Sequence, residues 1–231
     1  MAKYLDWELN FLNFKEALNY DKRTFFQYYL SLLKAKNIIL FAFYPVNDYN
    51  LKIIKINIFF LSIDIFFFFN SIFFDNSTIH QIYENEGIYN FSYFFQKIIY
   101  SFIISNYVIV IIKLLSLSQR HLLKLKEEEN MNNINDLVEK TKRCLIIKYI
   151  LFYLISFIFI TFFWYYLSSF CAVYKNTQFY VVKNMFISLG ISLLYPNFFN
   201  LLPCIFRLSS LRNNKPINDL LYKISKFIQI L

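Results

Sequence analysis

The acidic residue Asp64 lies inside a long apolar stretch, IFFLSIDIFFFFNSIFF. An ionised Asp at the centre of a membrane span costs about 2.5–3.5 kcal/mol, and such residues often mark ion or proton paths. Two interpretations of this intramembrane polar site follow. In the first, Asp64 belongs to a transport path or an inter-helix contact. In the second, its carboxyl is protonated or bonded to a neighbour, and it only fixes the packing. In the second case, we expect Asn106 or a serine of the fourth apolar block as its partner.

A second group of chemically capable side chains, His80, Glu84 and Glu86, occurs in a polar stretch after this block. His80 and Glu84 are four residues apart and would share one face of a helix. A metal site needs three or four ligands in fixed geometry, and no second histidine is nearby. The sequence therefore favours a solvated acidic loop and predicts no metal and no cofactor.

Motifs of known enzymes are missing from the sequence. It contains no HExxH, GxSxG, P-loop or GxGxxG motif, and its two glycines do not allow a glycine-rich phosphate loop. The cysteines Cys144, Cys171 and Cys204 lie far apart without CxxC spacing, which supports neither a disulfide framework nor a zinc site. For Cys144 and Cys204, a small buried side chain is favoured over palmitoylation. We therefore expect a protein that is not an enzyme.

The elements that carry these residues are four apolar blocks. The chain has 231 residues and an apolar fraction of 58%, above the roughly 45–50% of soluble domains. About 20 apolar residues in a helix cross a lipid core of about 30 Å. The blocks 53–74, 94–117, 145–169 and 180–206 are of about this length, and they predict an all-α integral membrane bundle of about four spans. In the fourth block, Gly190, Pro196 and Pro203 predict a kink or break.

Less apolar segments flank the predicted four-span domain, 53–206. The N-terminal part, 1–52, contains the segment 24–44, in which Lys34 and Lys36 fall in the middle, so we expect an interfacial helix that Pro45 ends. In the tail, 207–231, the segment 216–231 predicts an amphipathic helix lying in the membrane interface or packing on a partner helix. Its predicted apolar face is Ile217, Leu220, Leu221, Ile224, Phe227, Ile228 and Leu231.

The first twenty residues are polar, so the sequence predicts no signal peptide and a first span that inserts by itself. The short lead after Met1 also predicts no large ectodomain.

Positive charge predicts the orientation of the spans. The loop Asp75–Tyr93 contains no Lys or Arg, whereas the loop 118–143, the N-terminal segment and the tail are basic. Because positive loops stay in the cytoplasm, both termini are expected there. The two glycosylation sequons, at Asn76 and Asn90, lie in the loop predicted to face outward. The loop 118–143 is predicted to be a helical hairpin with a polar tip, or a partly disordered connector.

Four stretches resemble a known family. NDYNLKIIKI, FFDNSTIHQIYENEGIYNF, FFWYYLSSFCAVYKNTQ and LYPNFFNLLPCIFRLSSL are similar to blocks of an uncharacterised family of protist multi-pass membrane proteins, in which the segment is the C-terminal membrane module of larger surface proteins. The resemblance covers about residues 20–231. It implies a membrane-embedded module with an outward loop around Asn76–Glu86, and it implies no activity, cofactor or catalytic residue.

Taken together, these features predict a non-enzymatic anchor or assembly subunit. The alternative is a channel or transporter subunit that uses Asp64 and the broken fourth span. The expected partners are the lipid bilayer and, through the spans, further copies of this chain or other chains. The net charge of +9 comes from residues that flank the apolar blocks, so no nucleic-acid partner is expected.

Overall fold

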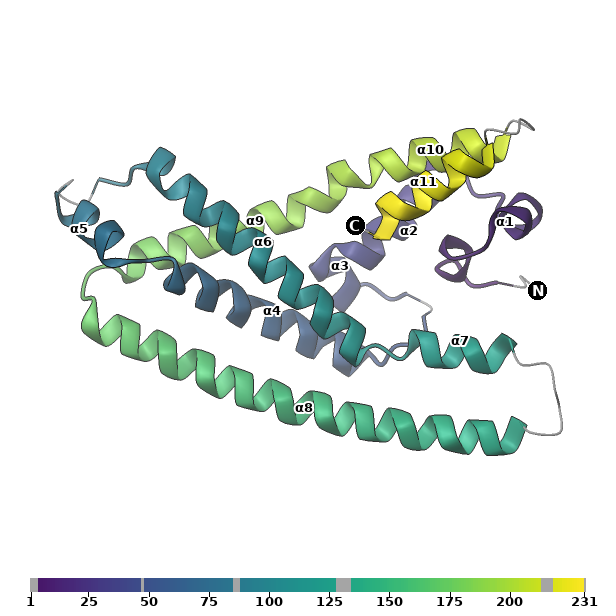
Figure 1. Ribbon diagram of the computed structural model, residues 1–231, viewed down its shortest axis with the longest axis horizontal. Coiled ribbons are helices and arrows are strands. Elements are labelled where there is room, and N and C mark those ends of the chain that lie inside the picture. The colour runs from purple at the N-terminus through teal and green to yellow at the C-terminus, as the bar shows by residue number, and fades with distance from the viewer. Residues whose placement is uncertain (1–3, 47, 85–87, 128–133, 213–217, 231) are drawn as a thin grey trace. The chain divides into compact units, whose positions relative to one another are not determined.

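All regular structure is helical in the residues that the computed structural model describes, which are 4–46, 48–84, 88–127, 134–212 and 218–230 (Figure 1). Within these ranges, four helical stretches are long and apolar enough to cross a membrane. They are Lys52–Ile72, Phe91–Leu123, Asn135–Val173 and Gln178–Arg212. The predicted all-α class with about four spans is confirmed, and the chain is a multi-pass membrane protein.

The chain divides into two compact units, which are described separately. Unit 1 combines Met1–Asp48 with Leu193–Leu231, and unit 2 is Tyr49–Ser192. The division falls inside α9 (Gln178–Phe199), the helix that begins the fourth candidate span. The two ends of the sequence therefore fold together, whereas the first three candidate spans belong to the other unit.

In unit 2, the helix α4 packs against both α6 and α8 (Figure 1). The helices of this unit are α4 (Lys52–Ile72), α5 (Asn76–Glu84), α6 (Phe91–Ser116), α7 (Gln119–Glu127), α8 (Ile134–Val173) and the first part of α9. The side chain of Asn90 begins α6 by accepting a hydrogen bond from the backbone N–H of Tyr93, at 3.3 Å. Such a cap satisfies one of the donors that the first turn of a helix leaves unpaired.

Helix α8 is longer than a span requires. Its 40 residues extend about 60 Å, roughly twice the thickness of the lipid core. The predicted span 145–169 is its middle part, and its first turns come from the predicted loop 118–143. The other flank of that loop forms α7, which packs on α8, while the predicted polar tip, 128–133, lies outside the described residues.

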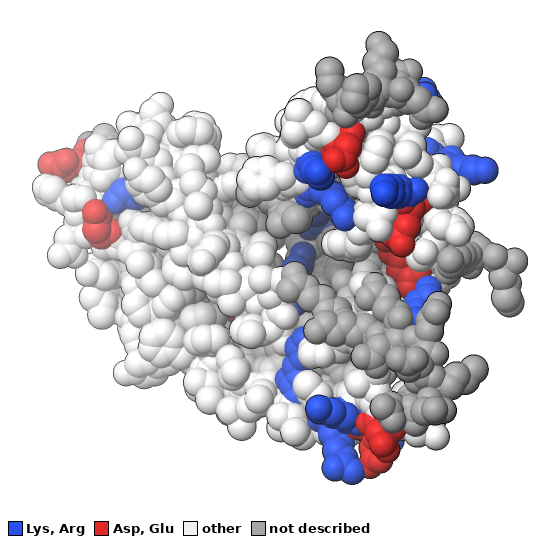
Figure 2. Space-filling model, turned by 45° about the vertical axis from the view of Figure 1, so that its right-hand side comes forward, with Lys and Arg blue, Asp and Glu red and all other residues white. Residues whose placement is uncertain are grey.

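Most of the apolar part of α8 is not covered by the other residues that the structure describes. Only 11% of this apolar stretch is buried within the protein. In the view of Figure 2, the span helices of unit 2 are white over most of their length, and charged side chains gather near α5 and near the start of α8. Such an uncharged band is what lipid requires of a spanning surface.

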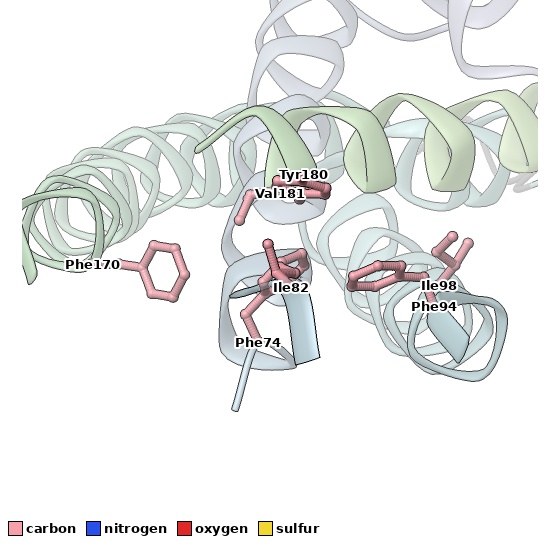
Figure 3. Packing of buried hydrophobic residues seen from close by; sticks show 7 residues of the cluster. All are labelled: Phe74, Ile82, Phe94, Ile98, Phe170, Tyr180 and Val181. Atoms are coloured by element: carbon pink, nitrogen blue, oxygen red, sulfur yellow. The ribbon is translucent and has the colours of Figure 1, made fainter. Parts of the chain in front are cut away.

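A cluster of buried side chains joins the helices at the end of unit 2 where α5 lies (Figure 3). Its members are Phe74, Ile82, Phe94, Ile98, Phe170, Tyr180 and Val181. The ring centroid of Phe94 lies 4.8 Å from that of Tyr89 and 6.3 Å from that of Tyr180, both in stacked orientation. Aromatic pairs contribute about 0.5–1.5 kcal/mol beyond their buried area, so the cluster fixes this end of the bundle.

Unit 1 contains short helices from both ends of the chain. They are η1 (Glu8–Asn10), α1 (Phe14–Tyr20), α2 (Phe25–Lys36), α3 (Ile38–Phe43), α10 (Leu201–Arg212) and α11 (Asn218–Ile230). Thr24 and Gln27 form a capping box at the start of α2. Helix α10 packs against α11 and α2.

The single helix predicted for 24–44 is two helices in the structure, divided at Asn37. The Asn37 side chain accepts hydrogen bonds from the backbone N–H groups of Ile39 and Leu40, at 3.1 and 3.2 Å. This cap begins α3 and stops α2, because an N-cap residue has a non-helical backbone. Asparagine competes with helical hydrogen bonding in this way, and this property is a local signal for the break.

The fourth apolar block is interrupted at Asn200, between α9 and α10. Pro196 lies inside α9, and Pro203 lies inside α10. Since Pro203 has no N–H to donate, the carbonyl of Phe199 loses its helical partner, which explains an interruption at this position.

Helix α11 packs on α10 through a different face from the predicted one. Tyr222 and Ser225 are buried, and their hydroxyls donate to the carbonyls of Leu12 and Pro203, each at 2.8 Å. In the predicted apolar face, Leu220 and Phe227 are 60% and 65% exposed, respectively. Two hydrogen-bonded polar residues therefore lie on the face that meets the protein, and contact of the predicted apolar face with the membrane interface stays a prediction. Pro216, Ile217 and Leu231 lie outside the described residues.

Candidate functional site

Asp64 lies on α4 in a crevice against α8. The crevice is lined by Phe68, Phe163 and Trp164 among others, and it leaves no room for a water molecule. The Trp164 side chain lies beside Asp64 in this crevice. The rings of Phe68 and Phe163 stack with their centroids 4.4 Å apart, which closes the contact between the two helices. Asp64 is therefore half-buried where it meets a neighbouring helix, in a narrow apolar crevice.

The partner that the sequence suggested for Asp64 has another role. Asn106 on α6 accepts a hydrogen bond from Ser192 on α9, at 2.9 Å. Ser192 belongs to a polar stripe on α9, formed by Asn184, Ser188 and Ser192 at four-residue spacing. Ser188 donates to the Asn70 side chain of α4 at 3.2 Å.

The α9 polar stripe holds the start of the fourth candidate span to its neighbours. Its remaining member, Asn184, accepts a hydrogen bond from the Tyr89 hydroxyl at 2.5 Å. Hydrogen bonds between membrane helices contribute about 0.6 kcal/mol each on average, and up to about 1.7. The four-residue spacing was visible in the sequence, but the partners on α4 and α6 were not.

A charged contact lies at the α5 end of unit 2. The Lys97 ammonium lies 2.8 Å from an Asp75 carboxylate oxygen, and the Thr78 side chain contacts both groups. Burial would raise the pKa of Asp75, but the hydrogen bonds from Lys97 and Thr78 outweigh it and hold that pKa well below its usual range. The positive charge of Lys97 is thus offset by a local carboxylate.

The predicted acidic loop forms α5. His80 and Glu84 share one face, with Nε2 and Oε1 3.1 Å apart, and both side chains are exposed. Among the residues that the structure describes, no three His, Cys, Asp or Glu side chains are grouped closely enough to hold a metal. Glu86 lies outside those residues.

The two sequon asparagines, Asn76 and Asn90, are exposed near the same end of unit 2. The side-chain Oδ1 of Asn76 accepts a hydrogen bond from the Tyr174 hydroxyl at 2.9 Å. The Asn90 side chain caps α6. Both positions are open at the surface, and their use as glycosylation sites is a prediction.

An ionic cluster in unit 1 was not found from the sequence. Arg207 on α10 is 1% exposed, and its Nε and Nη2 atoms donate to Oδ2 of Asp21 at 3.0 and 2.8 Å. Its guanidinium also lies over the rings of Tyr28 and Tyr222, 4.7 and 4.9 Å from their centroids. Asp21 and Arg207 are 186 residues apart in sequence, so no local pattern could have paired them.

The other carboxylate oxygen of Asp21 binds a second arginine. Arg23 Nε lies 2.8 Å from Oδ1 of Asp21, and Arg23 Nη1 lies 2.9 Å from Asp6. Burial would raise the pKa of Asp21, but the hydrogen bonds and charges of Arg23 and Arg207 outweigh it and lower that pKa below 3.8. The carboxylate therefore bridges two guanidinium groups. This Asp21 cluster is defined by Asp6, Asp21, Arg23 and Arg207.

The cysteines differ in exposure, and all three are free thiols. Cys204 is fully buried and packs with Tyr28 and Leu32, as the preference for a small buried side chain predicts. Cys171 is half-buried. Cys144 is exposed at the start of the apolar part of α8, so the burial favoured for it from the sequence is wrong.

A scan against protein-family models found no match for this chain, and searches of curated proteins and of solved structures also found none.

Proposed function

We propose that this chain is a non-enzymatic anchor or assembly subunit of a membrane. The observation that carries the proposal is the narrow apolar crevice in which half-buried Asp64 lies against α8. A transport path brings water or a series of polar groups to its ionisable residue. Asp64 instead contacts Trp164 in a crevice without room for water. Its role in this proposal is to fix α4 against α8.

The exposed surface of α8 supports the assembly part of the proposal. The described residues cover little of the apolar part of α8. This surface can therefore contact lipid and other membrane helices. The proposed partners are the bilayer and further copies of this chain or other chains, bound through the spans.

We also propose that the α7 end of unit 2 and both termini are cytoplasmic. The loop 118–143 carries six Lys and Arg residues. Near the α5 end there are three lysines, Lys97, Lys175 and Lys183, and Lys97 pairs with Asp75. The larger positive charge therefore lies at the α7 end, which the positive-inside rule places in the cytoplasm.

A channel or transporter subunit is the second candidate, and one observation favours it. Both polar side-chain atoms of Asn200 are buried without a hydrogen-bond partner among the described residues, at the interruption between α9 and α10. Broken helices with unpaired polar groups are typical of transporter sites.

A flux measurement separates the two candidates. The purified chain is reconstituted in vesicles, and proton and potassium flux are recorded for the unchanged protein, Asp64→Asn and Asn200→Leu. We expect no flux above that of protein-free vesicles in any of them, and Asp64→Asn should assemble at least as well because it removes an intramembrane charge. A conductance that either substitution abolishes would overturn the anchor proposal.

A further inference from the structure

A cavity of about 260 Å³ opens within unit 1. It lies between the turn that joins α1 to α2 and the C-terminal end of α10, and residues of the Asp21 cluster form part of its wall. Since a water molecule takes about 30 Å³ in the liquid, the cavity can hold a phosphate group together with several atoms of the molecule that carries it.

The walls of this cavity carry an excess of positive charge. Four cationic side chains line it, those of Lys22, Arg23, Arg207 and Arg212. Asp21 and Asp6 offset the charges of the two inner arginines, so the excess comes from Lys22 and Arg212. Neither Lys22 nor Arg212 forms an ion pair with another described residue, and both are exposed at its mouth. The charge is therefore available to an anion that enters.

The two inner arginines are already oriented. Asp21 holds Arg23 and Arg207 by hydrogen bonds of 2.8–3.0 Å, so their side chains lose little conformational freedom when an anion binds. Guanidinium groups suit phosphate because their planar N–H donors match its oxygens. Most N–H groups of these two arginines already donate to Asp6, Asp21 and backbone carbonyls. Lys22 and Arg212 therefore supply the free cationic donors, and the inner arginines form a fixed wall.

Apolar side chains form the rest of the wall. Leu18, Leu208 and Leu211 line the cavity, and Leu18 is 38% exposed. An inorganic anion would leave these side chains against water, whereas the glycerol or acyl part of a lipid would cover them.

We propose that this cavity binds the phosphate group of an anionic ligand, with a phosphorylated lipid headgroup as its source. Basic pockets beside membrane helices bind such headgroups. The site lies wholly within unit 1, so it does not depend on the anchor role. The proposed cytoplasmic placement enters only in the choice of a cytoplasmic-leaflet lipid as the probe.

Binding is measured on the full chain in phosphatidylcholine nanodiscs. The probes are dioctanoyl phosphatidylinositol phosphate, the free inositol phosphate headgroup, inorganic phosphate and uncharged dioctanoylglycerol. We expect the phosphorylated lipid to bind more tightly than the free headgroup or inorganic phosphate, and dioctanoylglycerol not to bind. Equal binding by the headgroup and the lipid would assign the site to a soluble phosphate compound.

Lys22→Gln and Arg212→Gln test the site directly, since both side chains are exposed and their loss leaves the Asp21 cluster intact. Each substitution should weaken binding about fivefold, as expected for one surface cation near a phosphate. Lys223→Gln is the matched control, because Lys223 is an exposed lysine of the same unit that does not line the cavity. The proposal fails if no phosphate probe binds, or if the double variant Lys22→Gln with Arg212→Gln binds as tightly as the unchanged chain.

Discussion

Asp21 and Arg207 are a buried ion pair whose charges would be costly if either stood alone. Both side chains are at most 3% exposed. Taking charges out of water costs several kcal/mol per ion, and the attraction between them offsets this only when the remaining hydrogen-bonding groups are also satisfied. Here Arg207 also donates to the carbonyls of Leu9 and Asn10, and Asp21 also accepts from Arg23.

Asp21→Asn is expected to destabilise unit 1 by about 3–5 kcal/mol, because it leaves Arg207 buried without its counter-charge. The measurement is denaturant unfolding in detergent, followed by the fluorescence of Trp7, a buried residue of unit 1. A Trp164→Phe background removes the other tryptophan of the chain. In the unchanged protein, the stabilisation by the Asp21 carboxylate is present at neutral pH. It is lost as the pH falls through the pKa of Asp21, which its arginine partners lower from the usual value.

Asp219→Asn is the control for this substitution. Asp219 pairs with Lys223 at 2.7 Å, but both side chains are exposed. Exposed pairs of this kind contribute little, so the change in the free energy of unfolding should stay within about 0.5 kcal/mol. Equal effects of the two substitutions would contradict a special role for the Asp21 cluster.

The packed helices α4 and α6 both carry small residues that are buried. Ser101 and Ser105 are four residues apart on α6 and fully buried, and Ser62 on α4 is 1% exposed. Small side chains at this spacing allow the backbones of membrane helices to come close, which strengthens their packing. Because these positions are packed, we expect a larger side chain there to lower the stability of the protein.

Ser101→Leu should destabilise unit 2 by about 1–3 kcal/mol, because extra methylenes in a packed contact force side chains and backbone to move. The protein is heated in detergent, and size-exclusion chromatography measures the fraction that remains folded. The temperature at which half is lost gives the apparent unfolding temperature. The same substitution at an exposed serine of α8, Ser169→Leu, should leave that temperature unchanged. A loss of similar size in both variants would contradict close packing at Ser101.

At the scale of the whole molecule, the orientation in the membrane can be tested with cysteines. In a Cys171→Ala background, the native Cys144 is exposed and should react with a membrane-impermeant thiol reagent only after cells are permeabilised. A second variant, Ser77→Cys with Cys144→Ser in the same background, should react in intact cells. Both expectations follow from the positive-inside rule.

Cys204 is buried and serves as an internal control that neither reagent treatment should label in the folded protein. Reaction of Cys144 in intact cells, with protection of a cysteine at position 77, would reverse the proposed orientation and place both termini outside.

The sequence by itself determined that the chain is helical and crosses a membrane. Apolar blocks of about 20 residues act locally, since each must satisfy its own backbone hydrogen bonds in lipid, and helix formation does so without any partner. The first two blocks therefore appear as helices whose ends lie within three residues of the prediction. The helix of the third block, α8, is longer, and the fourth block continues to Arg212 as two helices. The prolines of the fourth block likewise act on their own helix, and the interruption at Asn200 lies between them.

Only the tertiary structure decided which polar groups meet. Asp64 contacts Trp164, Asn106 contacts Ser192, and Asp21 contacts Arg207 across 186 residues. The structure also joined both ends of the chain into unit 1 and set which face of α11 is buried. A sequence pattern gives the direction of a side chain on its own helix, but a polar partner depends on how separate helices pack. That packing is fixed by the combined fit and hydrogen bonding of residues far apart in the chain.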